Sequence, residues 1–313
     1  MALNVEIKET IEYLQSNEAI AALNNDPYWP KWDTPWWRIM TLFEMEQVSL
    51  APEKIINLLI DRINANYIKT FPLYEEDIPE GTDPYRQIPC HCALGTIYQA
   101  LFAYGIDVDE RLPWLRPWFL KYQLPDGGLN CDEQAYTNSK KSSIVSTMPP
   151  LESILYCTPN GLNDSERNFV DHGARYLINH GLIYRSRSSA DKANVLLDPA
   201  FLELSFPRFY NYDFLRGLVW LIRWKQVRLK NDANDVIEEG QKLLQKKLVK
   251  TCEDNVIITE KLSYDKNETL SPGHGSQWEW RPAKHFPLLL KLSKTGQPSL
   301  FLKKYYDIAR NLE

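Results

Sequence analysis

The chain has few glycines, few cysteines and no long hydrophobic run. Its 313 residues include 13 glycines and 5 cysteines, and its net charge at pH 7 is -5. The apolar runs are short and broken by charged residues, so no segment is predicted to span a bilayer. The lack of a basic excess argues against a nucleic-acid-binding protein. An odd number of cysteines without framework spacing indicates free thiols in a reducing compartment.

Targeting and strand signals are also scarce. The first residues, MALNVEIKETIEYL, do not combine a basic region with an apolar core, so no signal peptide is predicted and a cytoplasmic location is favoured. No run of alternating β-branched residues ends in a tight Asn-Gly or Asp-Gly turn. Aromatic residues are abundant instead, with 10 Trp, 17 Tyr and 11 Phe. They favour a large core or a cavity with aromatic walls.

Helical periodicity recurs along the chain in two forms. Amphipathic stretches carry an apolar stripe opposite a charged face, as at Ile56, Leu59, Ile60 and Ile63. Other segments, such as CHCALGTIYQALFAYG and YDFLRGLVWLIRW, are apolar on nearly every side, which predicts helices buried all round. These buried segments begin near residues 33, 90, 147, 211 and 280, with amphipathic segments between them. This roughly regular spacing of the buried segments, a quasi-period, predicts repeated helical hairpins that form an inner and an outer layer.

Prolines stand near the starts of the buried segments. Pro35 and Pro149 fit the first turn of a helix, where the missing N–H has no partner to lose. Thr34 and Thr147 are plausible caps at the same positions. Pro287 falls inside the fifth buried segment, so it is expected either to kink that helix or to restart it.

A turn of distinctive composition separates two of these segments. The stretch QLPDGGL, residues 123–129, places two adjacent glycines behind Pro-Asp, so a positive φ is available at either glycine. It resembles the repeat of the squalene-cyclase and protein-prenyltransferase superfamily, in which a Gln-x-x-Asp-Gly-Gly-Trp/Leu turn links an outer helix to the next inner helix of an α/α toroid. Gln123, Asp126, Gly127, Gly128 and Leu129 match that turn.

The resemblance and the quasi-period together predict an all-α fold. We expect one α/α toroid domain over residues 1–313, built from five to six helical hairpins. In such a toroid the inner helices point the same way, so their N-termini meet at one mouth. Helix N-termini carry partial positive charge and free N–H groups, which suit an anionic ligand.

The resemblance also raises the question of zinc. Zinc takes three or four Cys, His and Asp ligands. Protein prenyltransferases hold a catalytic zinc with an Asp and a Cys one residue apart and a distant His. Here Cys131 and Asp132 are adjacent, and His274 or His285 lies downstream, so the implied zinc site has an altered spacing.

The motif CHC at the start of the second buried segment has two interpretations. Cys90, His91 and Cys92 are either metal ligands or small core residues at a tight helix start. Nothing in their spacing alone decides between the two.

Candidates for catalysis lie near the predicted mouth: His91, Asp132, Glu152 and Asp213. Glu152 falls early in a helix expected to be buried, and a buried carboxylate needs a partner or a raised pKa. Asp213 and Arg216 are three residues apart and either pair as a salt bridge or leave Arg216, or Arg208, to grip an anionic substrate. No Asp-x-Asp-Asp motif occurs, which argues against a protonation-driven cyclase.

Candidates for ligand binding lie beside the same helix starts: Trp36, Trp37, Lys141, Tyr212, Arg216, Trp280 and His285. The tryptophans are expected at the starts of the first and last inner helices, where they form either a packing seam or an aromatic wall for a prenyl chain, a cation or a sugar ring. Lys141 lies in a loop over the mouth and either neutralises a phosphate or is simply solvated.

Three functions remain open at this point. The first is an enzyme resembling the prenyltransferase and terpenoid-cyclase superfamily, such as a transferase, with a prenyl-type, apolar or anionic small molecule in a central cavity. The second is a carbohydrate-active α/α barrel that uses paired carboxylates such as Asp132 and Glu152 as acid and base. The third is a non-catalytic toroid that binds a ligand or a partner. Zinc is the cofactor to test in the first.

Overall fold

The computed structural model describes residues 3–66, 90–132, 135–185, 195–251, 255–272 and 278–310. Helices dominate these residues, as the sequence predicts. They are α1 (Asn4–Gln15), α2 (Asn17–Asn25), α3 (Pro35–Glu44), α4 (Glu53–Asn66), α5 (His91–Tyr104), α6 (Val108–Arg111), α7 (Leu115–Lys121), α8 (Ile144–Tyr156), α9 (Asp164–Asn179), α10 (Phe214–Arg228), α11 (Asn234–Gln245), α12 (Pro287–Leu292) and α13 (Leu300–Arg310).

Short elements connect the helices. They are the helical turns η1 (Val48–Leu50), η3 (Ala135–Ser139) and η4 (Pro199–Leu202) and the strands β1 (Val249–Lys250), β2 (Asn255–Val256), β3 (Glu268–Pro272) and β4 (Trp278–Pro282). The strands form two antiparallel pairs, β1 with β2 and β3 with β4. No described helix is both long enough and apolar enough to cross a membrane.

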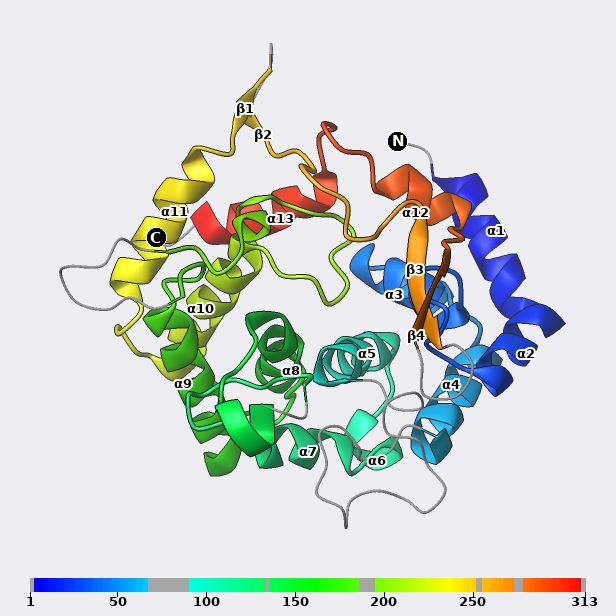
Figure 1. The fold of residues 1–313 in the computed structure, drawn as a ribbon, viewed down its shortest axis with the longest axis horizontal. Helices are drawn as coiled ribbons and strands as arrows, with labels where there is room; N and C mark the ends of the chain where they lie inside the picture. Colours follow the sequence, from blue (N-terminus) through cyan, green and yellow to red (C-terminus); the bar gives the residue numbers. More distant parts are fainter. Residues whose placement is uncertain are drawn as a thin grey trace.

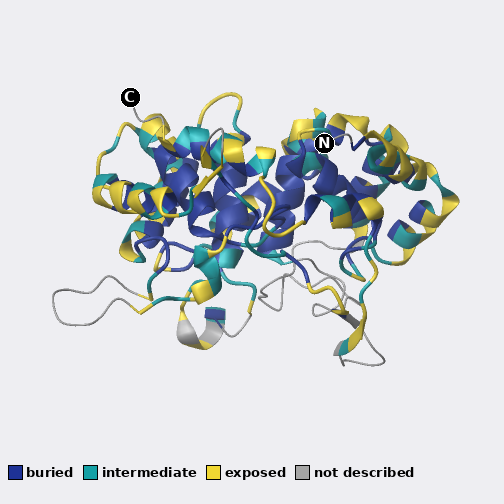
Figure 2. Cartoon of the chain, turned by 90° about the horizontal axis from the view of Figure 1, so that it is seen from above, coloured by how far each residue is buried: buried dark blue, intermediate teal, exposed yellow. Residues whose placement is uncertain are grey.

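Four of the five segments that the sequence predicts as buried helices lie in the interior. Figure 1 shows α3, α5, α8 and α10 around the middle of the molecule, with α4, α7, α9 and α11 outside them. The inner helices contact one another in chain order, α3 with α5, α5 with α8, and α8 with α10. In α5 every residue from His91 to Leu101 is buried, whereas α11 buries one face only. Figure 2 shows the buried residues gathered inside this arrangement and the exposed residues around it.

α5 and α8 approach each other very closely. A Cβ atom built on Gly95 of α5 would lie 2.4 Å from the carbonyl carbon of Pro149 and 2.5 Å from the nitrogen of Pro150. Pro149 and Pro150 lie inside α8, which begins earlier than expected, at Ile144. The first-turn position predicted for Pro149 is therefore wrong. The Ser153 hydroxyl lies between the two helices, within hydrogen-bond distance of the carbonyls of both Pro149 (2.6 Å) and Gly95 (3.1 Å).

The glycine turn links α7 to the segment that leads into α8, as predicted from the motif. Gly127 has φ +98°, and its Cα packs so close to α9 that an added Cβ would lie 2.2 Å from the His172 carbonyl oxygen. The Gln123 side chain donates at 2.8 Å to the carbonyls of both Gly127 and Phe169. The motif thus joins the turn to an outer helix by side-chain hydrogen bonds, and it also fixes the path of the residues that follow.

The last part of the chain departs from the prediction. The fifth buried segment was expected to start near residue 280, but residues 278–282 form strand β4, and Trp280 is 65% exposed. The helix starts only at Pro287, which occupies its first turn and so restarts it rather than kinking it. α13 is an amphipathic helix, the kind predicted for the outer layer, and it contacts both the inner helix α10 and the outer helix α11 (Figure 1). Helix periodicity alone does not tell whether α13 lies in the inner or the outer layer, because an amphipathic helix fits both positions.

Candidate functional site

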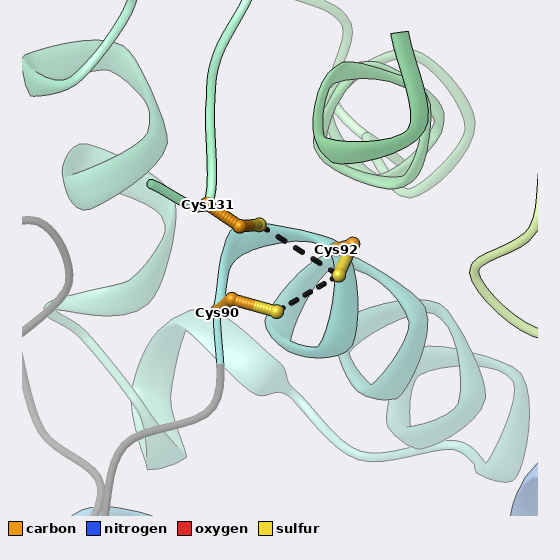
Figure 3. A group of neighbouring side chains, drawn as sticks. All are labelled: Cys90, Cys92 and Cys131. Atoms are coloured by element: carbon orange, nitrogen blue, oxygen red, sulfur yellow. Dashed lines mark hydrogen bonds between the residues drawn. The ribbon is translucent and has the colours of Figure 1, made fainter. Parts of the chain in front are cut away.

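Three cysteine thiols meet at the N-terminal end of α5. Cys90 is the N-cap residue of α5, Cys92 lies in its first turn, and Cys131 follows the glycine turn. The Sγ atoms of Cys90 and Cys92 are 2.9 Å apart, and those of Cys131 and Cys92 are 3.7 Å apart (Figure 3). All three sulfur atoms lie within 4.8 Å of one another. We call these residues the thiol cluster.

Local backbone contacts bring Cys131 to α5. The backbone N–H of Leu129 donates at 2.8 Å to the hydroxyl of Thr147, in the first part of α8. The N–H of Ser143 donates to the Leu129 carbonyl at 2.8 Å. These two hydrogen bonds hold Leu129 against the first part of α8. Because α8 packs directly on α5, they also place residue 131 beside the start of α5. The cluster therefore depends on the glycine turn and on the packing of two inner helices.

The thiol cluster has the donor set and nearly the geometry of a zinc site. Sulfur ligands at about 2.3 Å in a tetrahedral arrangement stand about 3.8 Å apart, close to the separation of Cys131 and Cys92. The Cys90 and Cys92 sulfurs would have to move apart by rotation about their side-chain bonds. Among the described residues no histidine, aspartate or glutamate joins the group, so this part of the chain offers three ligands there. The cluster could hold a metal ion.

The three thiols differ in acidity. Hydrogen bonds from Cys131 and Cys92 lower the pKa of Cys90 well below the usual thiol range, and the N–H of Ala93 and the charge of Lys31 contribute. Hydrogen bonds with Cys131 and Cys90, together with burial, raise the pKa of Cys92. Burial is the main cause that raises the pKa of Cys131. Cys90 is thus the thiol that ionises first.

A half-buried cation and aromatic rings lie near the cluster. The Lys31 ammonium donates to the Tyr210 hydroxyl at 2.8 Å and lies 5.0 Å from the centre of the Trp29 ring. Burial lowers the pKa of Lys31, but the attraction of Tyr210, Cys90 and other thiols raises it by more, so the net shift is upward. The amine therefore stays charged beside the thiols.

His91 faces away from the thiol cluster. Its ring is fully buried among Phe119, Tyr122 and Tyr136, with ring centres 5.9 to 6.3 Å away. Burial lowers its pKa to about 4, so the ring is neutral at physiological pH. Its Nδ1 atom has no hydrogen-bond partner among the described residues. Cys90 can reach Cys92 because it is the N-cap residue of α5 and has an extended backbone (φ −69°, ψ 168°), whereas residues two apart within a helix point about 200° apart.

The other residues predicted as zinc ligands do not belong to the thiol cluster. Asp132 is exposed, and His285 contacts the Asp265 carbonyl at 3.0 Å and the Tyr264 ring. Neither belongs to the group of possible metal ligands that contains Cys131. His274 lies outside the described residues.

Two predicted ligand-binding residues are exposed, and three are in the core. Lys141 is exposed, and its carbonyl accepts from the Asn130 side chain, while Trp280 lies on β4. Trp36 and Trp37 are buried in an aromatic cluster, where the Trp37 indole donates to the Tyr28 carbonyl at 3.0 Å. Tyr212 is buried too, and its hydroxyl donates to the Leu182 carbonyl at 2.9 Å.

Glu152 and Arg216 form a buried ion pair. Arg216 donates from Nε to Oε1 at 2.8 Å and from Nη2 to Oε2 at 2.6 Å, and Gln99 donates to Oε2 at 3.2 Å. Arg216 also donates to the carbonyls of Phe209 and Asn211. The alternative pairing with Asp213 is wrong, because Asp213 instead caps α10 and accepts from the Arg216 backbone N–H at 2.9 Å.

The ion pair lies at the wall of a cavity of about 710 Å³. Residues of five helices line it: Phe43 and Glu44 of α3, Gln99 and Ala103 of α5, Glu152 and Tyr156 of α8, Arg216, Val219 and Arg223 of α10, and Lys304, Tyr305 and Ile308 of α13, with Arg208 and residues near η1. The lining residues of α3, α5 and α8 come from their C-terminal halves. On α5, Ala103 lies about 18 Å along the helix from His91, so the cavity and the thiol cluster occupy opposite ends of that helix.

The sequence alone missed two features of this region. Lys31 precedes the first inner helix and was not singled out, although a lysine within the aromatic run YWPKW is an unusual neighbour for tryptophans. Glu44 ends α3 and contributes a carboxylate to the cavity, for which the sequence has no signal.

The chain matches no protein-family model, no curated protein and no solved structure.

Proposed function

We propose that the protein is a zinc-dependent transferase built on an α/α toroid, resembling the squalene-cyclase and protein-prenyltransferase superfamily. Support for the toroid comes from the buried inner helices, the glycine turn between α7 and α8, and a cavity lined by α3, α5, α8, α10 and α13. The observation that carries the function is the thiol cluster.

Three ligands from the described residues favour a catalytic zinc over a structural one. Structural zinc sites are closed by four protein ligands, whereas catalytic sites leave a position for water or substrate. A zinc ion bound there would supply a Lewis acid and an activated oxygen or sulfur nucleophile. With zinc bound, three thiolates would exceed its two positive charges by one, and the Lys31 ammonium would balance the excess. The rings of Trp29 and Tyr210 beside Lys31 offer an apolar wall for a prenyl-type substrate.

Metal analysis tests the proposal. The purified full chain should carry about one zinc ion per molecule, and Cys92→Ser and Cys131→Ser should each lose most of it. Cys157→Ser is the matched control, because Cys157 is a free, buried cysteine outside the cluster. That variant should keep its zinc.

The open position can be tested by replacing zinc with cobalt. Three thiolate ligands should give strong sulfur-to-metal absorption, and an added small thiol should change the visible bands only if a coordination position is free. A thermal shift with farnesyl diphosphate but not with oligosaccharides would support the prenyl-type substrate. Failure of the apoprotein to bind zinc, or a Cys90–Cys92 disulfide in the protein isolated under reducing conditions, would overturn the proposal.

A further inference from the structure

The central cavity contains a buried cation whose hydrogen-bonding groups are not all used. Arg208 is 5% exposed and lines the cavity. Its Nε and Nη1 atoms have no hydrogen-bond partner among the described residues, and no described carboxylate lies within ion-pair distance of it. The guanidinium stacks on the Tyr305 ring, 3.8 Å from its centre. A buried guanidinium with unpaired N–H groups is unfavourable unless a partner completes it.

Arg216 lines the same cavity and provides an internal comparison. Its Nε, Nη1 and Nη2 atoms all donate, to Glu152 and to two backbone carbonyls. Arg216 therefore shows that every donor nitrogen of a buried arginine beside this cavity can be satisfied within the fold. Arg208 differs in that its Nε and Nη1 atoms have no described partner, although the residue lines the cavity. A planar guanidinium of this kind matches a carboxylate in a bidentate arrangement.

The remaining walls of the cavity are largely apolar. Phe43, Val48, Ala103, Val219 and Ile308 line it, and Tyr156, which is 40% exposed, faces it as well. A volume of about 710 Å³ is within the range of small-molecule sites, which are mostly apolar with a few polar groups that fix orientation. A ligand that fits these walls has a hydrocarbon body and one polar end.

Nearby carboxylates limit the charge of that polar end. Glu44 lines the cavity and accepts from the Phe209 N–H at 2.7 Å, and the Oε2 atom of Glu44 and the Oδ2 atom of Asp213 have no described partner. Burial lowers the pKa of Arg208, but Tyr305, Asp213 and Glu44 raise it by more, so it stays charged. Of the other cations that line the cavity, Arg216 pairs with Glu152 and Lys304 with Glu46. Beside Arg208, Glu44 and Asp213 therefore disfavour a head group with two or more negative charges, whereas a single charge is matched by Arg208.

We propose that the central cavity binds an apolar monocarboxylic acid, with its carboxylate on Arg208 and its hydrocarbon chain against the apolar walls. This site lies at the far end of α5 from the thiol cluster and is independent of zinc. Its ligand class also differs from the prenyl-type substrate proposed at the cluster.

Calorimetric titration of the full chain with matched amphiphiles tests this inference. The probes are dodecanoate, dodecan-1-ol and dodecyl phosphate, which share one chain length and differ in head-group charge. Dodecanoate should bind at least about tenfold more tightly than the other two, since the charged partner of a buried arginine gives a strong hydrogen bond. Arg208→Gln should remove that preference and leave the affinity for dodecan-1-ol unchanged.

Two further variants keep the test decisive. Arg223→Gln is the matched control, because Arg223 lines the same cavity but its described partner is only Gln226, and dodecanoate binding should change less than about twofold. Ala103→Trp places a large side chain at an exposed position of the wall and should block all three probes while Arg208 is intact. Zinc content should stay unchanged in every variant.

The inference is overturned if dodecanoate binds no more tightly than dodecan-1-ol, or if Arg208→Gln, folded by circular dichroism, keeps the preference. Tighter binding of dodecyl phosphate would reject the single-charge argument. If Arg208→Gln does not fold, binding of dodecanoate by Ala103→Trp with wild-type affinity would reject the cavity as the site. None of these outcomes bears on the zinc proposal, which metal analysis decides separately.

Discussion

The buried pair of Glu152 and Arg216 allows a quantitative prediction for Glu152→Gln. The substitution preserves side-chain shape but removes the negative charge, so Arg216 stays buried, 5% exposed, without a counter-charge. Two charge-assisted hydrogen bonds, at 2.8 and 2.6 Å, are weakened. Breaking a buried ion pair in this way lowers the free energy of unfolding by about 3–5 kcal/mol.

This loss is large enough to measure by thermal melting. Unfolding entropy is about 2.1 cal/mol/K per residue, so for this chain a loss of about 3–5 kcal/mol lowers the melting temperature by about 5–8 °C. Glu12→Gln is the matched control, because the Lys8–Glu12 pair is on the surface, with both side chains at least 60% exposed. It should change the free energy of unfolding by less than about 0.5 kcal/mol.

A double variant separates the ion pair from other roles of Glu152. Glu152→Leu with Arg216→Met replaces both charges by apolar groups, and should recover at least half of the loss seen in Glu152→Gln. The recovery is not complete, because the Phe209 and Asn211 carbonyls lose their Arg216 donor. If Glu152→Gln melts within about 1 °C of wild type, the pair does not hold α8 to α10, and our account of Glu152 is refuted.

Two further predictions concern packing and pH. Gly95→Ala should destabilise the chain by more than about 3 kcal/mol or prevent folding, because its Cβ would meet the backbone of Pro149 at 2.4 Å; a melting temperature like that of wild type would contradict this contact. The pKa of Asp171 is lowered to about 2, because hydrogen bonds from Arg228 and Lys230 outweigh the opposing effect of burial. A lowered carboxyl pKa stabilises the fold fully above the unfolded value of about 4, and this stabilisation is lost as the pH falls towards 2. Asp171→Asn should therefore reduce the free energy of unfolding at pH 7 by about 2 kcal/mol, and the difference from wild type in urea unfolding should shrink as the pH falls below about 4. A difference independent of pH would rule out charge as its cause.

Much of the candidate site was visible in the sequence as separate parts. CHC at the start of an all-apolar segment, a third cysteine after the glycine turn, and a carboxylate in a buried helix were each identified. The residues that each of these parts contacts were not identified from the sequence. Cys131 was assigned to Asp132 and a distant histidine, but it meets Cys90 and Cys92. Glu152 pairs with Arg216, which lies 64 residues further along the chain.

The sequence by itself determined what depends on neighbouring residues. The glycine turn forms because Gly127 tolerates φ +98°, and α5 is recognisable because its residues are apolar all round. Only the tertiary structure decided which distant side chains meet, as in the thiol cluster, and that α13 rather than α12 lines the cavity. The physical reason is that backbone dihedral preferences and helical periodicity act within a few residues. Contacts between helices depend instead on how whole surfaces pack, and no local pattern encodes that.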